Sequence, residues 1–184
     1  MMIKAILFDI SGVLHVDNEP VNGAIEAIQL ARNEQIVVRF VTNTSRKTST
    51  DMLQSLLQMG FDLSVEEVLT APGAVKLALQ QRKLRPYCLV HEKLRPEFAD
   101  LDQSSPNAVV IADAGDGFNY ANMNRAFQLV MDGAPLLGIG LNRYFRQNEE
   151  LQLDAGPFIA ALEFACDVEA EILGKPAKAF FQTA

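Results

Sequence analysis

Cysteine and histidine are scarce in this chain of 184 residues. The two cysteines, Cys88 and Cys166, lie far apart, and they form no metal-binding spacing with His15 or His91. Both cysteines have apolar neighbours in the sequence, which favours buried free thiols. We therefore expect a reducing compartment rather than a disulfide-stabilised secreted protein.

Basic charge is also in deficit, with 16 Lys and Arg against 23 Asp and Glu, so the formal net charge is −7. Nucleic acid is thereby excluded as an expected partner, because binding it requires clustered cations that replace phosphate counterions. Small phosphorylated ligands stay compatible with this charge, since a few local donors can hold them.

Long apolar runs, sequence repeats and low-complexity tracts are missing as well. No run is long enough to span a bilayer, and the N-terminus leads straight into an expected strand without a signal peptide. These features predict a cytoplasmic protein with no membrane partner.

What the chain does have is an apolar segment, Ala5-Ile6-Leu7-Phe8, that ends in Asp9 and is followed by Ser11 and Gly12. A short apolar run is typical of a strand buried on both faces of a parallel sheet. Ligands of open α/β sheets bind at the carboxyl ends of the strands, so Asp9 is a candidate functional acid. The alternative is that Asp9 merely opens a turn with Gly12.

Strands and helices are expected to alternate along the whole chain, with a linker-like break at residues 83–86. Strands are expected over residues 5–9, 36–41, 68–70, 87–90, 108–112, 136–141 and 170–173, with a hairpin joining 144–146 to 151–153. Helices are expected over residues 23–32, 49–59, 72–82, 94–100, 120–131 and 156–166, and another opens at Pro176. Such alternation indicates parallel pairing through right-handed crossovers, hence an α/β fold with a Rossmann-like core and an inserted α/β domain.

Three polar residues, Asp9, Thr42 and Lys175, follow expected strands of this core. Their types suit phosphoryl transfer. A carboxylate can attack phosphorus, a hydroxyl can hold phosphoryl oxygens, and a lysine can neutralise their charge. Taken singly, Thr42 is typical of a helix cap and Lys175 of a solvated surface residue.

Three segments resemble, in order, the first three motifs of the haloacid dehalogenase (HAD) superfamily of phosphatases. They are Asp9-Ile10-Ser11-Gly12-Val13, Val41-Thr42-Asn43 and Gly174-Lys175-Pro176. The long insert before the third motif is similar to the large, C2-type α/β cap of subfamily IIA. The resemblance implies a core over residues 1–83 and 169–184 and a cap over residues 84–168.

The resemblance also implies roles for individual residues. Asp9 would be the nucleophile that forms an aspartyl-phosphate, and Mg²⁺ would be held by the Asp9 carboxylate and the Ser11 backbone carbonyl. Thr42 and the Asn43 amide would bind the phosphoryl oxygens of a small phosphorylated substrate, and Lys175 would complete the clamp. The cap would close over the site and set substrate choice.

The chain departs from this family in two places. Most family phosphatases carry an aspartate that acts as general acid and base where this chain has Ser11. Loss of such a group typically lowers the reaction rate by about 10²–10⁴-fold. We therefore expect substrates whose leaving group needs little help: phosphoramidates, pyrophosphate or activated esters. The family's fourth motif, an acidic Gly-Asp-Asp segment, does not follow Lys175, so we expect an incomplete core, weak activity and association, for example as a homodimer.

Two other interpretations stay open at the level of sequence: a phospho-acceptor signalling module of the receiver type, and a HAD-fold binding or scaffold protein without turnover. We expect His15 to be a partly exposed residue of a flap beside the site, and we expect Asp113 to Asp116 to form a surface turn. The candidates for cap residues that face the site are Arg143, Tyr144, Asp154 and Gly156.

Overall fold

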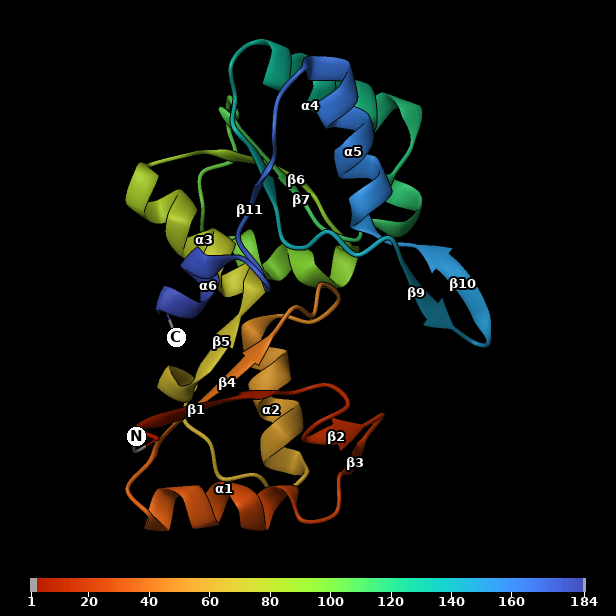
Figure 1. Ribbon diagram of the computed structural model, residues 1–184. Coiled ribbons are helices and arrows are strands. Elements are labelled where there is room, and N and C mark those ends of the chain that lie inside the picture. Colours follow the sequence, from red (N-terminus) through yellow and green to blue (C-terminus); the bar gives the residue numbers. More distant parts are fainter. Residues whose placement is uncertain (1–2, 184) are drawn as a thin grey trace.

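The computed structural model describes residues 3–183 and divides them into two lobes, each built around a parallel sheet (Figure 1). The α/β architecture expected from the sequence is confirmed. The ends of the expected core, residues 1–2 and 184, lie outside the described residues.

The first lobe contains strands β1 (Ala5–Asp9), β4 (Val37–Thr42) and β5 (Val68–Thr70), all parallel and in the order β1-β4-β5. Asp9, the last residue of β1, lies opposite Val41 near the end of β4. Because the strands are parallel, their carboxyl ends share one edge of the sheet, and the polar residues that follow them gather there.

Helices α1 (Ala24–Asn33) and α2 (Ser49–Gln58) cover this sheet through an apolar core. Both carry the apolar spacing that predicts a helix with one buried face. Leu56 on α2 is fully buried, whereas its neighbour Leu57 is more than one-third exposed. Thr48 caps α2 by accepting a hydrogen bond from the Asp51 N–H at 3.0 Å.

The second lobe holds a four-stranded parallel sheet in the order β11-β8-β7-β6. Its strands are β6 (Pro86–Leu89), β7 (Ala108–Ile111), β8 (Leu136–Gly138) and β11 (Glu171–Ile172). One face packs against α4 (Tyr120–Met131) and α5 (Ala155–Cys166). The other face packs against α3 (Ala71–Arg82) and the 3-10 segment η2 (Glu92–Phe98), so α3 contributes to the core that joins the lobes.

Strand β11 differs from the expectation that placed it with the core. It pairs with β8, with Glu171 opposite Leu137, and the chain leaves the second sheet only at about Leu173. The apolar character of residues 170–173 predicts a strand but carries no information on which sheet receives it.

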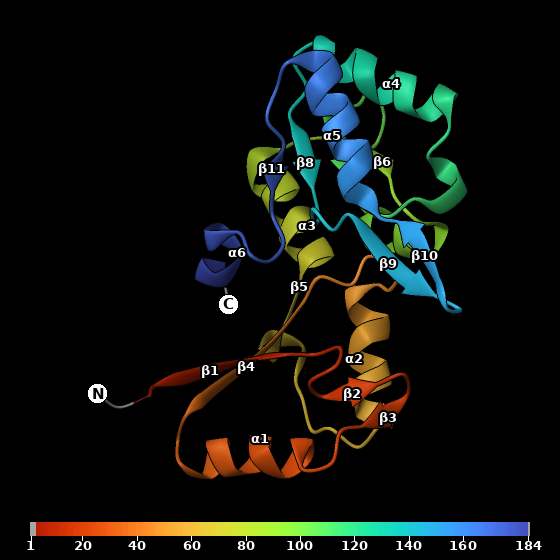
Figure 2. The same cartoon turned by 45° about the vertical axis from the view of Figure 1, so that its right-hand side comes forward.

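The expected hairpin is confirmed as the antiparallel pair β9 (Tyr144–Gln147) and β10 (Glu150–Leu153). A smaller hairpin, β2 (His15–Val16) with β3 (Glu19–Pro20), follows β1. Both hairpins lie on the same side of the molecule in both views (Figures 1 and 2).

Short elements complete the described chain. They are the 3-10 segments η1 (Val65–Glu67) and η3 (Gly115–Gly117) and the helix α6 (Lys178–Thr183). Within residues 3–183 no helix is both long and apolar enough to cross a membrane.

The amphipathic character of α2 gives a stability prediction. Leu56→Ala should lower the free energy of unfolding by about 2–5 kcal/mol, because it leaves a cavity in the core of the first lobe. Leu57→Ala on the same helix should cost less than about 1 kcal/mol, since that side chain is already partly in water. Urea denaturation followed by circular dichroism measures both, and equal losses would contradict the assigned buried face.

Candidate active site

A cavity of about 560 Å³ lies at the carboxyl ends of β1 and β4, and both lobes line it. The first-lobe sheet and the loops after its strands contribute Asp9, Ser11, Thr42, Asn43, Thr44, Ser45 and Arg46, and Lys175 lies beside them. The second lobe and its hairpin contribute Asp113, Asn142, Phe145, Arg146 and Asp154. All the residues that the sequence predicted for catalysis, metal and phosphate binding are therefore brought together.

Asp9 and Lys175 form the central ion pair of this cavity. The Lys175 Nζ lies 2.6 Å from Asp9 Oδ1 and 3.3 Å from the Val41 carbonyl oxygen. The Ile10 N–H also donates to Asp9 Oδ1, at 2.8 Å. Within residues 3–183 no group donates to the second oxygen, Oδ2, and the Asp9 side chain is 47% exposed. The carboxylate is thus anchored through one oxygen and presents the other.

Asn43 holds the backbone that carries Lys175. Its side-chain Nδ2 donates to the Lys175 carbonyl at 2.8 Å, and its Oδ1 accepts from the Lys175 N–H at 2.7 Å. This reciprocal pair leaves the Asn43 side chain occupied, so the group that Asn43 can offer to a phosphoryl oxygen is its backbone N–H.

Thr42 ends β4 and is 2% exposed, with its hydroxyl oxygen accepting from the Thr44 N–H at 3.2 Å. Accepting this bond leaves the hydroxyl proton free for an oxygen in the cavity. Ser11 is exposed, lines the cavity and precedes Gly12, whose φ of +79° suits a glycine in this tight loop.

His15 corrects the expectation of a partly exposed flap residue. It is buried, it does not line the cavity, and its Nδ1 lies 2.8 Å from the Asp17 carbonyl oxygen. His15 is the first residue of β2, in the hairpin between β1 and α1. The sequence around it does not indicate that this side chain is buried.

Arg46 links the two lobes across the cavity, and sequence reasoning missed it. Its Nε forms an ion pair with Asp113, and its Nη1 donates to Gln147 Oε1 at 3.0 Å. Its Cζ lies 4.6 Å from the centroid of the Phe145 ring, within the range of a cation–π contact. The sequence feature that could have identified Arg46 is its position as a cationic residue in the loop after Thr42, the last residue of β4.

Asp113 is buried, which contradicts the expected surface turn, although its Oδ1 does accept from the Gly115 N–H at 3.0 Å as in a turn. It comes two residues after the apolar strand β7, and Asp9 likewise stands at the end of the apolar strand β1. That pattern was the available signal for a second acid aimed at the site.

Of the four cap candidates only Asp154 lines the cavity. Within β9 Phe145 and Arg146 line it and Tyr144 does not. Arg143 and Gly156 instead take part through their backbones, as acceptor and donor of hydrogen bonds that fix the start of α5.

Magnesium fits the donor set at Asp9, although residues 3–183 contain no group of three or more His, Cys, Asp or Glu placed to hold a metal. Mg²⁺ in phosphate-processing sites is typically bound through one or two carboxylates, with water and substrate phosphate completing its shell. The Asp9 carboxylate and the backbone carbonyl of Ser11 are oxygen ligands of the kind this coordination needs.

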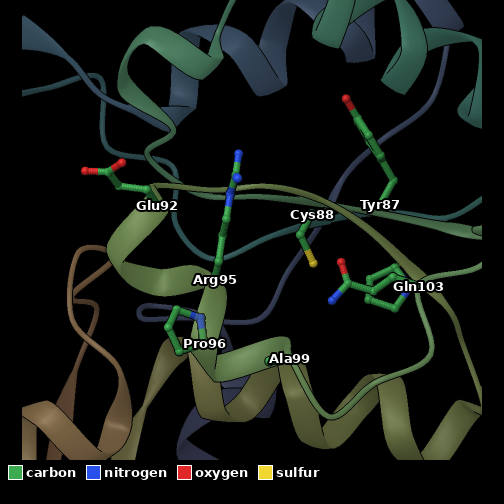
Figure 3. Close-up of a pocket in the computed structure, with 8 residues that line it drawn as sticks. Tyr87, Cys88, Glu92, Arg95, Pro96, Ala99 and Gln103 are labelled. Carbon is green, nitrogen blue, oxygen red and sulfur yellow. The ribbon is translucent and has the colours of Figure 1, made fainter.

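A second hollow, about 670 Å³ in volume, lies along the edge strand β6 and is drawn in Figure 3. Its lining includes Tyr87, Cys88, Arg95 and Gln103. Burial raises the pKa of the Cys88 thiol to about 12, so this sulfur is protonated at neutral pH and is not a nucleophile. The chemistry therefore belongs to the cavity at Asp9.

A carboxylate and a lysine thus meet at the carboxyl edge of a parallel sheet, beside a second α/β lobe, which is the arrangement of a two-lobed α/β protein with a ligand site between its lobes. The family of haloacid dehalogenase-like hydrolases matches residues 6–104. The chain belongs to this family and is a phosphatase.

Two kinds of relative support this assignment. The bovine (Bos taurus) phospholysine phosphohistidine inorganic pyrophosphate phosphatase is 45% identical over 188 residues, which cover 99% of this chain and 70% of that protein. The 4-nitrophenylphosphatase of Thermotoga maritima superposes with a TM-score of 0.85 at 22% identity, covering 98% of this chain and 71% of that one. The glycerol phosphate phosphatase of Mycobacterium tuberculosis, solved in complex with magnesium, has a TM-score of 0.79 at 21% identity. The match covers 97% of this chain and 56% of that one. Such structures show the shared fold.

Gly174 gives a prediction about how Lys175 is placed. A Cβ there would lie 2.0 Å from the Ile139 carbonyl oxygen and 2.8 Å from Asn43 Oδ1. Gly174→Ala should therefore lower the free energy of unfolding by about 1–3 kcal/mol and reduce hydrolysis of 4-nitrophenyl phosphate, because the backbone before Lys175 must shift.

Gly140→Ala is the matched control, since its Cβ would make only an ordinary contact, 3.7 Å from Asn43 Nδ2. Thermal unfolding and steady-state assays of both variants measure the two effects. Wild-type activity in Gly174→Ala would show that the reciprocal pair does not place the lysine.

Proposed function

We propose that this chain is a magnesium-dependent phosphatase that transfers the phosphoryl group of a small phosphorylated substrate to Asp9 and then to water. The observation that carries the proposal is the 2.6 Å contact between Lys175 and Asp9, which joins the first and third motifs across 166 residues. The receiver-type interpretation finds no support in this arrangement, because the acid stands on the first strand of the sheet.

The proposal includes a division into core and cap. The expected cap, residues 84–168, is extended to about residue 173, because β11 is hydrogen-bonded within the second sheet. Contacts from the core hold this cap: Arg46 pairs with Asp113, and the Ser49 N–H and hydroxyl each donate to Glu97 at 2.8 Å. A cap held beside Asp9 in this way would contact the leaving group of a substrate bound there.

The nucleophile is the second oxygen of Asp9. When Oδ2 attacks phosphorus, an O–P bond forms, the bond to the leaving group breaks, and its electron pair departs with that group. Lys175 offsets charge on the phosphoryl oxygens, which the Thr42 hydroxyl and the Asn43 backbone N–H would also hold. Water then hydrolyses the acyl phosphate and restores Asp9.

Asp9 and Ser11 would hold the magnesium ion through the carboxylate and the backbone carbonyl. Bound there, the ion neutralises phosphate charge that would otherwise repel the attacking carboxylate. The magnesium complex of the Mycobacterium tuberculosis relative supports this choice of metal.

Ser11 shapes the proposed substrate class, because a hydroxyl is a poor proton donor at neutral pH. In a phosphoramidate the nitrogen is easily protonated, and the protonated nitrogen carries a positive charge. When the P–N bond breaks, its electrons stay on nitrogen, which leaves as a neutral amine without an enzyme acid. The name of the bovine relative, a phosphatase for phospholysine, phosphohistidine and pyrophosphate, supports phosphoramidates or pyrophosphate here.

We also propose that the protein works in the cytoplasm, which its free cysteines suit, and that it binds neither nucleic acid nor membranes. Association into a homodimer remains part of the proposal.

Asp9→Asn tests the proposed nucleophile. Hydrolysis of 4-nitrophenyl phosphate with Mg²⁺ should fall by at least about 10⁴-fold, because an amide does not attack phosphorus. The exposed-acid variant Asp62→Asn is the control for loss of one charge. Beryllium fluoride should bind the wild type, seen by ¹⁹F NMR, and not Asp9→Asn. Activity that survives in Asp9→Asn would refute the mechanism. A wild type that neither hydrolyses 4-nitrophenyl phosphate nor binds beryllium fluoride would be a binding or scaffold protein.

Ser11→Asp tests the proposed reason for substrate choice. Restoring a carboxyl acid/base should raise kcat for an unactivated alkyl phosphate by about 10²–10⁴-fold and leave 4-nitrophenyl phosphate less affected, since its leaving group needs no proton. Both rates come from phosphate-release assays on folded protein. An unchanged rate for the alkyl phosphate would remove Ser11 as the cause of selectivity.

A further inference from the structure

The charged side chains that line the cavity are not evenly paired. Asp9 is paired with Lys175, and Asp113 with Arg46. Asp154 lines the same cavity, and within residues 3–183 it has no cationic partner.

The remaining cavity cation does not fill this role. Arg146 donates from Nη1 to the Glu149 carbonyl at 3.0 Å, within its own hairpin. Asp154 is therefore a carboxylate whose counter-charge is not supplied by the cavity residues described.

Asp154 is held rigidly at the first turn of α5. Its Oδ1 accepts from the Ala155 N–H at 2.7 Å, and its own N–H donates to the Arg143 carbonyl at 3.2 Å. The first turn of α5 is fixed as well, because the Gly156 N–H donates to the Asn142 carbonyl at 3.0 Å and a Cβ at Gly156 would lie 2.6 Å from that oxygen.

The second oxygen of Asp154 is open to the cavity. The residue is 8% exposed, and Oδ2 makes no hydrogen bond within residues 3–183. Oδ2 keeps some accessible surface. In this it differs from His15 Nε2, which is fully enclosed and has no hydrogen-bond partner within the described residues. A mostly buried carboxylate that still reaches a cavity interacts strongly with any cation placed there, because little water screens it.

We propose that Asp154 is a specificity-determining residue that binds a positively charged group, an ammonium or an imidazolium, on the leaving group of the substrate. The inference rests on the proposed function, since it needs a phosphoryl group at Asp9 with its leaving group directed toward the cap. It divides the proposed substrates: phosphorylated amines place positive charge near Asp154, whereas pyrophosphate places negative charge there and is disfavoured.

The experiment uses two aryl phosphates of equal shape, 4-(aminomethyl)phenyl phosphate and 4-ethylphenyl phosphate, which differ in one positive charge. Both leaving groups are activated, so Ser11 affects them alike. The wild type should prefer the cationic substrate in kcat/KM by roughly tenfold, the scale of a hydrogen bond between charged groups, and the gain should lie mainly in KM.

Asp154→Asn should abolish this preference, and Asp154→Ser should do the same. Both substitutes are good helix N-caps, so α5 should keep its start, which circular dichroism verifies. Asp116→Asn, which removes one exposed acid from the same lobe outside the cavity, should keep the wild-type preference.

The outcomes separate the two proposals. A wild type that hydrolyses neither substrate refutes the proposed function. A wild type that hydrolyses both without preference, or an Asp154→Asn variant that keeps the preference, refutes the role of Asp154 and leaves the phosphatase in place. A loss of preference in Asp116→Asn as well would assign the effect to net charge and equally refute the specific role.

Discussion

The contact between Lys175 and Asp9 is the interaction on which the rest of the structure depends. Its two residues are 166 positions apart in sequence and 2.6 Å apart in space. The contact can form only because the whole second lobe is inserted between them and returns the chain to the edge of the first sheet. Asn43 secures that return by bonding both backbone groups of Lys175, and Gly174 permits it by having no side chain. A local motif thus becomes a site through a long-range constraint.

The same constraint explains how the lobes share one core. Helix α3 follows β5 of the first sheet, yet its buried side chains pack on the second sheet, so neither lobe is fully covered without the other. Arg46 and Glu97 add polar links on either side of this junction. The Asp113 carboxylate is buried, so its pairing with Arg46 costs desolvation energy and contributes more to a defined geometry than to stability. In this protein the polar links set the position of the cap residues above Asp9.

Much of the fold followed from local patterns. The apolar runs and the hairpin that joins residues 144–146 to 151–153 each act over a few residues, and the structure has the strands and the hairpin that they predict. The three motifs also converge as expected, because parallel strands end at a common edge. The contacts of Arg46, the burial of Asp113 and the pairing of β11 were not predicted, since each depends on segments that are distant in the sequence.

The sequence by itself determined the class of fold, the family and the residue types at the reacting centre, because short-range periodicity and motif order carry that information. Only the tertiary structure decided which charges are paired and which remain open. Lys175 is taken by Asp9 and Arg46 by Asp113, which singles out Asp154 among the cavity acids. Pairing is a property of distances between separate segments, and distances of a few ångströms are set when two lobes pack together.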